Sequence, residues 1–174
     1  MPGLCMRWCC GLVLASAVEV WGLLPQNHQA FAQPTAEAGS VLGRQVRELH
    51  EAGRFREALD LAKRYVDEAK RSFGEGDLRT TNSLLWLAHV HVSLGQLQEA
   101  ETPLRSALAI REAKLPATHA DVATVLNNLA HLLVQQGRLG EAEGLYAKSL
   151  KINEGTLDPK HPRIAAGLNN LASL

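Results

Sequence analysis

Residues 123–162 read ATVLNNLAHLLVQQGRLGEAEGLYAKSLKINEGTLDPKHP, and this stretch decides the fold. Apolar side chains recur three and four positions apart from Val122 to Leu133, which predicts an amphipathic helix over 122–136. Gly137 follows as a natural helix terminator, because glycine adopts positive φ without strain. A second apolar pattern predicts another helix over 138–154, and TLDP then forms a link to His161-Pro162. The stretch is therefore predicted to be a helical hairpin.

The same pattern recurs every 42 residues, as Gly53, Gly95 and Gly137 show. Residues 78–119 and 120–161 align without gaps at 15 identical positions, and residues 120–132 and 162–174 share 7. We therefore predict repeats at 36–77, 78–119 and 120–161 and a partial repeat at 162–174. The earlier repeats predict helices over about 41–52, 78–94 and 96–114, the last of them bent by Pro103.

The composition agrees with an all-α chain. The 174 residues include 46% hydrophobic but only 5% aromatic side chains, and alanine and leucine favour helices. The 18 basic and 18 acidic residues cancel, which argues against a strongly basic nucleic-acid-binding protein.

The first 32 residues have the layout of a secretory signal peptide. Arg7 precedes the apolar run WCCGLVLASAV at 8–18, and Ala30-Phe31-Ala32 provides small residues before a cleavage site. Residues 33–40 then read as a flexible leader, and the domain occupies 41–174. All three cysteines fall within residues 1–10. We expect an exported, periplasmic or secreted protein without a membrane span after cleavage. An uncleaved anchor over residues 8–24 and a start at Met6 remain alternatives.

The chain resembles the tetratricopeptide repeat (TPR) family, and in particular the 42-residue repeats of kinesin light chains and their bacterial relatives. The resemblance rests on the stretch quoted above and on SLLWLAHVHVSLGQLQEAETPLRSALAIREAKL at 83–115. Leu-Ala in the first helix, glycine before the second and alanine early in the second recur together in both. The resemblance implies a right-handed α-solenoid of antiparallel helix hairpins, with the first helix of each repeat on the concave side and the second on the convex side.

Family members bind peptides in the concave groove, so the resemblance implies candidate contacts on the first helix of each repeat. These positions are Asn82, Leu85, Trp86, His89, Ser93, Thr124, Asn127, Asn128, His131, Gln135, Asn169 and Asn170, followed by Ser173. Asparagine amides both donate and accept hydrogen bonds and so suit a peptide backbone. Trp86 would offer an apolar platform. The same asparagines would equally brace neighbouring helices. The groove lacks the Lys and Arg residues with which other TPR proteins clamp a carboxylate.

The sequence favours neither catalysis nor a metal site. His89 and His131 occupy equivalent repeat positions, but no cysteine or acidic residue stands near them to complete a ligand set. His119 and His161 fall between repeats, where capping or packing is expected. No phosphate-binding glycine motif occurs. We therefore expect no enzyme activity, no cofactor and no metal.

These observations predict a non-catalytic exported scaffold that binds a protein or peptide partner. The chain stops inside the first helix of its fourth repeat. Two alternatives follow from this position: a fragment of a longer repeat protein without independent function, or a chain that forms a homodimer through its uncovered C-terminal end.

Overall fold

The computed structural model describes residues 41–174, so the predicted signal peptide and leader lie outside the described residues. Helices make up nearly all of the described part of the chain: α1 (Val41–Glu51), α2 (Phe55–Phe73), α3 (Leu78–Ser93), α4 (Leu97–Lys114), α5 (Ala120–Gln135), α6 (Leu139–Thr156) and α7 (Pro162–Ala172). Helices α3, α5 and α7 begin at 42-residue intervals. The predicted all-α class is confirmed.

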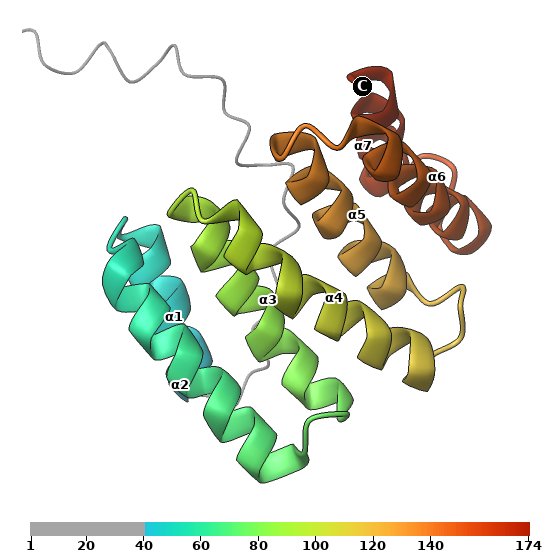
Figure 1. Cartoon of the computed structure of the whole chain (residues 1–174). Helices are drawn as coiled ribbons and strands as arrows, with labels where there is room; N and C mark the ends of the chain where they lie inside the picture. The colour runs from blue at the N-terminus through green and yellow to red at the C-terminus, as the bar shows by residue number, and fades with distance from the viewer. Residues whose placement is uncertain (1–40) are drawn as a thin grey trace, which may run out of the picture.

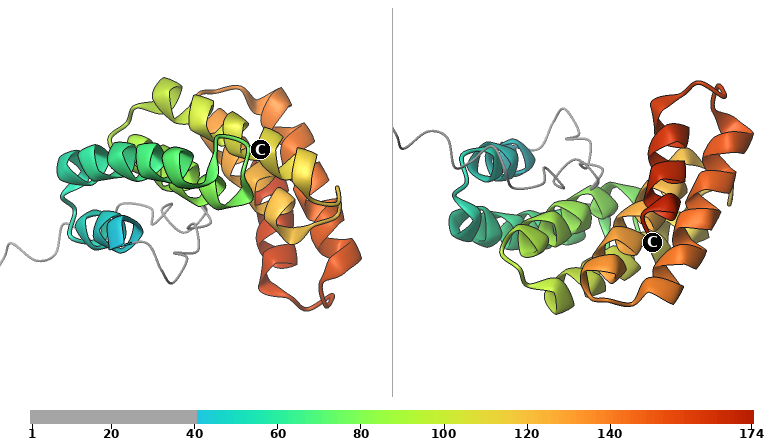
Figure 2. Two further views of the ribbon diagram at one scale, coloured as in Figure 1. Left: turned by 90° about the horizontal axis from the view of Figure 1, so that it is seen from below. Right: turned by 90° about the horizontal axis from the view of Figure 1, so that it is seen from above.

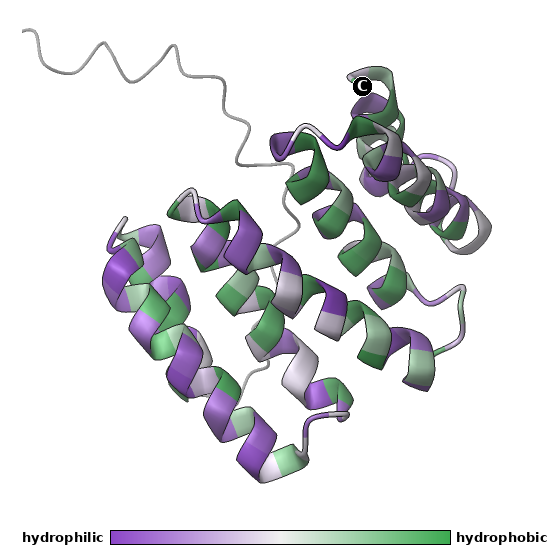
Figure 3. Cartoon of the chain, in the orientation of Figure 1, coloured by the Kyte–Doolittle hydropathy of each residue, from purple (hydrophilic) through white to green (hydrophobic). Residues whose placement is uncertain are grey.

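The helices follow one another as antiparallel hairpins along a curved path (Figures 1 and 2). Hairpins α1–α2, α3–α4 and α5–α6 are complete, and α7 packs against α6 at the C-terminal end. Helix α5 is mostly hydrophobic in Figure 3, whereas hydrophilic residues predominate on the visible face of α2. Ten residues of α5 are buried, whereas five residues of the longer α2 are, so more of α5 is removed from water.

The turns within the hairpins use glycine for a conformational reason. Gly53, Gly95 and Gly137 have φ of 72°, 72° and 76°, in the left-handed region that other residues rarely adopt. The predicted stop at Gly137 is confirmed, although α5 and α6 begin and end one to two residues away from the predicted limits. Helix α4 continues through Pro103, which is buried inside it.

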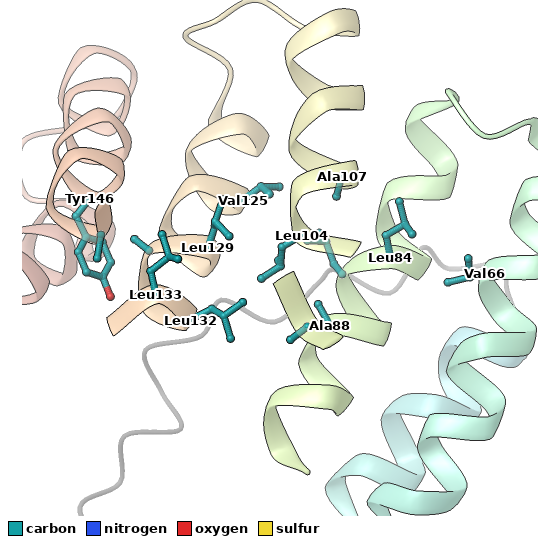
Figure 4. Close-up of a cluster of buried hydrophobic side chains, with 14 residues drawn as sticks. Val66, Leu84, Ala88, Leu104, Ala107, Val125, Leu129, Leu132, Leu133 and Tyr146 are labelled. Atoms are coloured by element: carbon teal, nitrogen blue, oxygen red, sulfur yellow. The ribbon is translucent and has the colours of Figure 1, made fainter. Parts of the chain in front are cut away.

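Small residues allow the two helices of each hairpin to approach closely. Ala88 and Ala100 are fully buried in the second hairpin, as are Ala130 and Ala142 in the third. Larger side chains such as Leu104 fill the space around them and complete one continuous core (Figure 4). Because this core crosses the boundary between hairpins, no hairpin buries its apolar faces alone.

A second buried cluster joins the first hairpin to α3. It contains Val46, Ala58, Ala62, Tyr65, Trp86 and Val90. Gly43 belongs to this contact, since a Cβ atom there would lie 3.2 Å from the Tyr65 ring. Trp86 thus connects the N-terminal hairpin to the rest of the array.

Candidate functional site

The predicted groove residues fall into two groups by exposure. Six are buried, with at most 8% of their surface exposed: Asn82, Leu85, Trp86, His89, Asn128 and His131. The other six are half-buried or exposed: Ser93, Thr124, Asn127, Gln135, Asn169 and Asn170, with Ser173 also exposed. Most of the accessible group belongs to α5 and α7. The accessible polar residues therefore concentrate toward the C-terminal half of the array.

Polar side chains of α5 and α7 meet directly. The Asn170 Nδ2 group donates a hydrogen bond to Asn127 Oδ1 at 3.0 Å. One turn further along α5, the Gln135 amide donates to His131 Nε2 at 2.9 Å. The Thr124 hydroxyl donates to the carbonyl of Ala120 within the same helix. Thr124, Asn127, His131 and Gln135 follow one another three or four positions apart along α5, and Asn170 joins them from α7, so these five residues form an uncharged polar strip.

A histidine of α1 provides the corresponding bridge to α3. His50 Nε2 and Ser93 Oγ form a hydrogen bond of 2.8 Å. The Ser93 hydroxyl donates a second hydrogen bond, of 3.1 Å, to the His89 carbonyl. The His50 ring lies 4.4 Å from His89 and 6.1 Å from Trp86, measured between centroids. His50 therefore closes an aromatic cluster between the first and second hairpins, to which Phe55 contributes at 5.1 Å.

Trp86 is 1% exposed, and its indole belongs to the buried cluster between the first hairpin and α3. Its Nε1 group has no hydrogen-bond partner among the described residues. A buried donor of this kind costs free energy unless a partner reaches it. In this conformation Trp86 serves mainly as packing, and an open apolar platform would require the side chain to move.

Arg111 is a buried cation at the junction of the second and third hairpins. Its guanidinium donates to Thr81 Oγ1 at 3.2 Å, to Asn82 Oδ1 at 3.2 Å and to the Asp121 carbonyl at 2.9 Å. Burial lowers the pKa of Arg111 from its ordinary value, although the nearby Asp121 carboxylate opposes the shift. Because Asn82 gives its amide oxygen to Arg111, it holds in place the side chain that reaches across the junction to the Asp121 carbonyl.

A network of charges holds the same junction on its outer side. Glu101 of α4 accepts from Arg138 at 2.8 Å and pairs with Arg105 at 2.6 Å, and Arg138 also pairs with Glu141 at 2.7 Å. Burial would raise the pKa of Glu101, but hydrogen bonds from Arg105, Arg138 and Gln136 outweigh it and lower that pKa. The third hairpin is thus attached to the second by both a buried cation and a surface network.

The two inter-repeat histidines have the expected capping role. His119 Nδ1 accepts from the Asp121 N–H, and His161 Nδ1 accepts from the Arg163 N–H, each at 3.1 Å. They are the N-caps of α5 and α7, and Pro162 follows in the first turn of α7. Asp77 is the equivalent cap of α3.

Among residues 41–174 no cluster of three or more His, Cys, Asp or Glu side chains could hold a metal ion. No helix in that part of the chain is long and apolar enough to cross a membrane.

Sequence reasoning missed His50 and Arg111. Arg111 had a usable signal, because it falls in the apolar stripe of α4 with Leu104 and Ala107. A lone charge in such a stripe indicates a buried, hydrogen-bonded cation. His50 had no comparable signal, since its partner Ser93 lies 43 residues away.

The helix pairs, their glycine turns and their alanine crossings match one family. The family model for the tetratricopeptide repeat matches residues 48–113 and 121–174. The chain belongs to the tetratricopeptide repeat family. No curated protein sequence gives a significant match to the chain.

Solved structures share the kinesin light chain-like form of this TPR array. Two crystal structures of nearly identical TPR-like repeats, from a Podosopora anserina protein assigned as a kinesin light chain, superpose with a TM-score of 0.71 at 25% identity. The alignments cover 75% of this chain but only 61% and 62% of those proteins. The expected resemblance to kinesin light chain-type repeats is therefore confirmed.

Proposed function

We propose that this TPR protein is a non-catalytic, exported scaffold that binds an extended peptide segment of a partner protein along the concave face. TPR arrays commonly mediate protein–protein interaction, and membership of the family is shown by the family model. The observation that carries the proposal is the uncharged polar strip on α5 and α7, centred on the hydrogen-bonded pair Asn127 and Asn170.

The chemistry of this strip suits a peptide backbone. Amide groups both donate and accept, so they match the alternating N–H and C=O groups of an extended chain. The strip carries no Lys or Arg, and we expect recognition through backbone amides and neutral side chains rather than through a ligand carboxylate.

The accessible side chains define where binding is expected to begin. Asn127, Asn169 and Gln135 reach solvent on α5 and α7, whereas Trp86 and Asn128 are 1% and 0% exposed. We expect the accessible group to make the first contacts. Engagement of the buried group would require its side chains to move out of the core.

A peptide library selected against the purified chain would test groove binding. A selected peptide should lose about 3–10-fold in affinity on Asn127→Ala or Asn169→Ala, the effect of one or two lost hydrogen bonds, by isothermal titration calorimetry. Ser106→Ala on the exposed side of α4 provides the matched control and should leave affinity unchanged. Equal affinities for all three variants would contradict the groove assignment.

Export is a separate element of the proposal and needs a separate test. It rests on the apolar run at 8–18 and on the Ala30-Phe31-Ala32 site. N-terminal sequencing of the protein from fractionated cells should find Gln33 first. An intact N-terminus in a membrane fraction would favour the anchor alternative over residues 8–24.

A further inference from the structure

The contact between α1 and α3 brings two histidine rings together. The ring centroids of His50 and His89 lie 4.4 Å apart, with 56° between the ring planes. His50 Nε2 and Ser93 Oγ also form a hydrogen bond of 2.8 Å, which holds the His50 ring beside α3. His89 is 7% exposed and His50 is half-buried. Two groups that can each take up a proton close to neutral pH therefore share one confined contact.

Trp86 is the third ring of this contact. Its indole meets His50 at 6.1 Å and His89 at 5.7 Å between centroids, edge to face in both cases. Trp86 is 1% exposed, so the two histidines form part of its cover. Its Nε1 group has no hydrogen-bond partner among the described residues, and water would satisfy this donor if the contact opened. Opening thus recovers one hydrogen bond at the expense of apolar contact.

The main core of the array does not depend on this contact. Among the residues of the first hairpin, only Val66 of α2 belongs to that core, whose other buried members come from α3 to α6. The cluster that contains Trp86 is separate, and Val46 is its buried member from α1. Helix α1 can therefore part from α3 while the second and third hairpins stay packed.

The protonation state of the two histidines decides whether the contact is favourable. Two neutral imidazoles pack as aromatic rings. Two imidazolium ions at the same separation repel each other, and burial deprives them of the water that would weaken the repulsion. An imidazole in water takes up its proton near pH 6.5. Mild acid therefore favours an arrangement in which both rings reach solvent.

The charged groups of α1 and α2 near His50 carry both signs. Arg47 lies one turn before His50 on α1 and adds positive charge, whereas the Glu51 carboxylate is exposed and acts through water. Arg54, at the start of α2, pairs with Glu57 at 2.6 Å. The titratable hydroxyl of α2 at this junction belongs to Tyr65, which packs against Gly43, two turns away from His50.

The other titratable side chains of α3 lie away from the histidine pair. His91 follows His89 by two positions and therefore points to a different side of the helix, where its Nδ1 atom is hydrogen-bonded to Gln96 Oε1 at 2.7 Å. Arg79 pairs with Asp77 at the opposite end of α3. Neither one supplies a charge that would compensate a proton on His89.

The helices beyond α3 leave the pair similarly uncompensated. On α4, Arg111 is held by Thr81 near the start of α3, and Glu101 pairs with Arg138 on the outer side of the array. On α5, His131 occupies the position equivalent to His89 one repeat later. No Asp or Glu joins His50 and His89 in a cluster of three ligand-type side chains within residues 41–174.

We propose that the His50–His89 contact is a pH-sensitive switch, closed over Trp86 at neutral pH and opened by protonation of both imidazoles, which releases α1 from α3 and exposes the indole. The switch lies at the first hairpin and is independent of peptide binding to the polar strip on α5 and α7. An opening that takes up one proton becomes about tenfold more favourable per pH unit, and one that takes up two about a hundredfold.

Tryptophan fluorescence of the full chain tests the switch, because Trp86 is the only tryptophan apart from Trp8 and Trp21. With Trp8→Phe and Trp21→Phe in place, the emission maximum and the acrylamide quenching of Trp86 are measured from neutral pH to about pH 5. The opening constant should rise about tenfold or more per pH unit below about pH 6.5. Circular dichroism should lose at most the helical signal of α1. A Trp86 that stays buried throughout, or is exposed only as the whole helical signal disappears, would overturn the switch.

Histidine variants identify the groups that titrate. His50→Gln retains a hydrogen-bonding group near Ser93 but cannot be protonated, so it should abolish acid opening. His91→Gln is the matched control and should open like the parent chain. His50→Glu places a carboxylate beside protonated His89 and should reverse the sign, so that mild acid holds the contact closed. Acid opening that persists in His50→Gln or His50→Glu, or that is lost in His91→Gln, would overturn the assignment to the His50–His89 pair.

Discussion

The junction between hairpins α3–α4 and α5–α6 differs sharply from the junction between α5–α6 and α7, although both derive from the same repeat. In the first, Arg111 of α4 donates across the boundary to the Asp121 carbonyl of α5, and Thr81 and Asn82 of its own hairpin hold the guanidinium in place. In the second, the equivalent Asn153 is buried and its Oδ1 atom has no partner among the described residues. Leu126 is 3% exposed, whereas its equivalent Leu168 is 53% exposed. Sequence identity between repeats therefore does not imply equal energetic roles.

The comparison shows that position in the array decides what a repeat residue contributes. The side chain at a given repeat position meets a neighbour only if the next helix is present, and its burial follows from that neighbour. Asparagine in place of Arg111 is also too short to span the boundary. The junction between the second and third hairpins is thus expected to tolerate substitution less well than the junction with α7. It is also expected to stabilise the fold more.

The largest expected effect separates two leucines at the same repeat position. Leu126→Ala should lower the free energy of unfolding by about 2–4 kcal/mol, because it leaves a cavity in a packed core. Leu168→Ala should change it by less than about 0.5 kcal/mol, since an exposed side chain leaves no cavity. Urea unfolding of both variants measures the difference. Similar losses in the two would contradict the contrast in burial.

Arg111 and Asn153 are expected to respond with opposite sign. Arg111→Ala should cost about 2–4 kcal/mol, because it leaves Thr81, Asn82 and the Asp121 carbonyl without their donor. Asn153→Leu should be neutral or stabilising by up to about 1 kcal/mol, since it removes a buried atom that lacks a partner. Thermal unfolding followed by circular dichroism provides the measurement. A stabilising Arg111→Ala would show that the buried cation serves specificity instead.

Glu101 should make the junction between the second and third hairpins sensitive to acid. Hydrogen bonds from Arg105, Arg138 and Gln136 outweigh burial and lower its folded-state pKa, so its stabilising contribution is present above the unfolded pKa of about 4.5 and is lost as pH falls through the lower folded value. Glu101→Gln should cost about 1 kcal/mol at neutral pH and nothing once the wild-type carboxylate is protonated. Glu143, the exposed residue at the equivalent position 42 residues later, provides the control, and Glu143→Gln should show no resolvable change in stability at either pH.

The smallest expected effect concerns Asp77, the N-cap of α3. The Arg79 side chain, and then its backbone N–H, hold the pKa of Asp77 at about 2. The contribution of Asp77 to stability is therefore present above its ordinary value of 3.8 and is lost as pH falls through about 2. Asp77→Asn keeps a capping oxygen but removes this titration. Carboxyl NMR titration checks the pKa, and a normal value would contradict the Arg79 contact.

Much of the helical architecture could be predicted, because it depends on local spacing. The 42-residue period placed the helix pairs, Gly137 marked a turn, and alanines such as Ala130 and Ala142 marked the crossings. Helix ends differed by one or two residues, since fraying and capping depend on nearby side chains. The candidate groove was less predictable. Repeat position identified Asn127 and Trp86 alike, yet only the former reaches solvent.

The amino-acid sequence by itself determined that this chain is an array of helical hairpins with a 42-residue period, because apolar periodicity, glycine turns and small crossing residues are properties of neighbouring positions. Only the tertiary structure decided which polar groups pair across repeats, as in Asn127 with Asn170 and Arg111 with the Asp121 carbonyl. It also decided that Trp86 is core and that Leu168 is surface. Burial and hydrogen bonding between residues of different hairpins depend on how the hairpins stack, which one repeat alone does not specify.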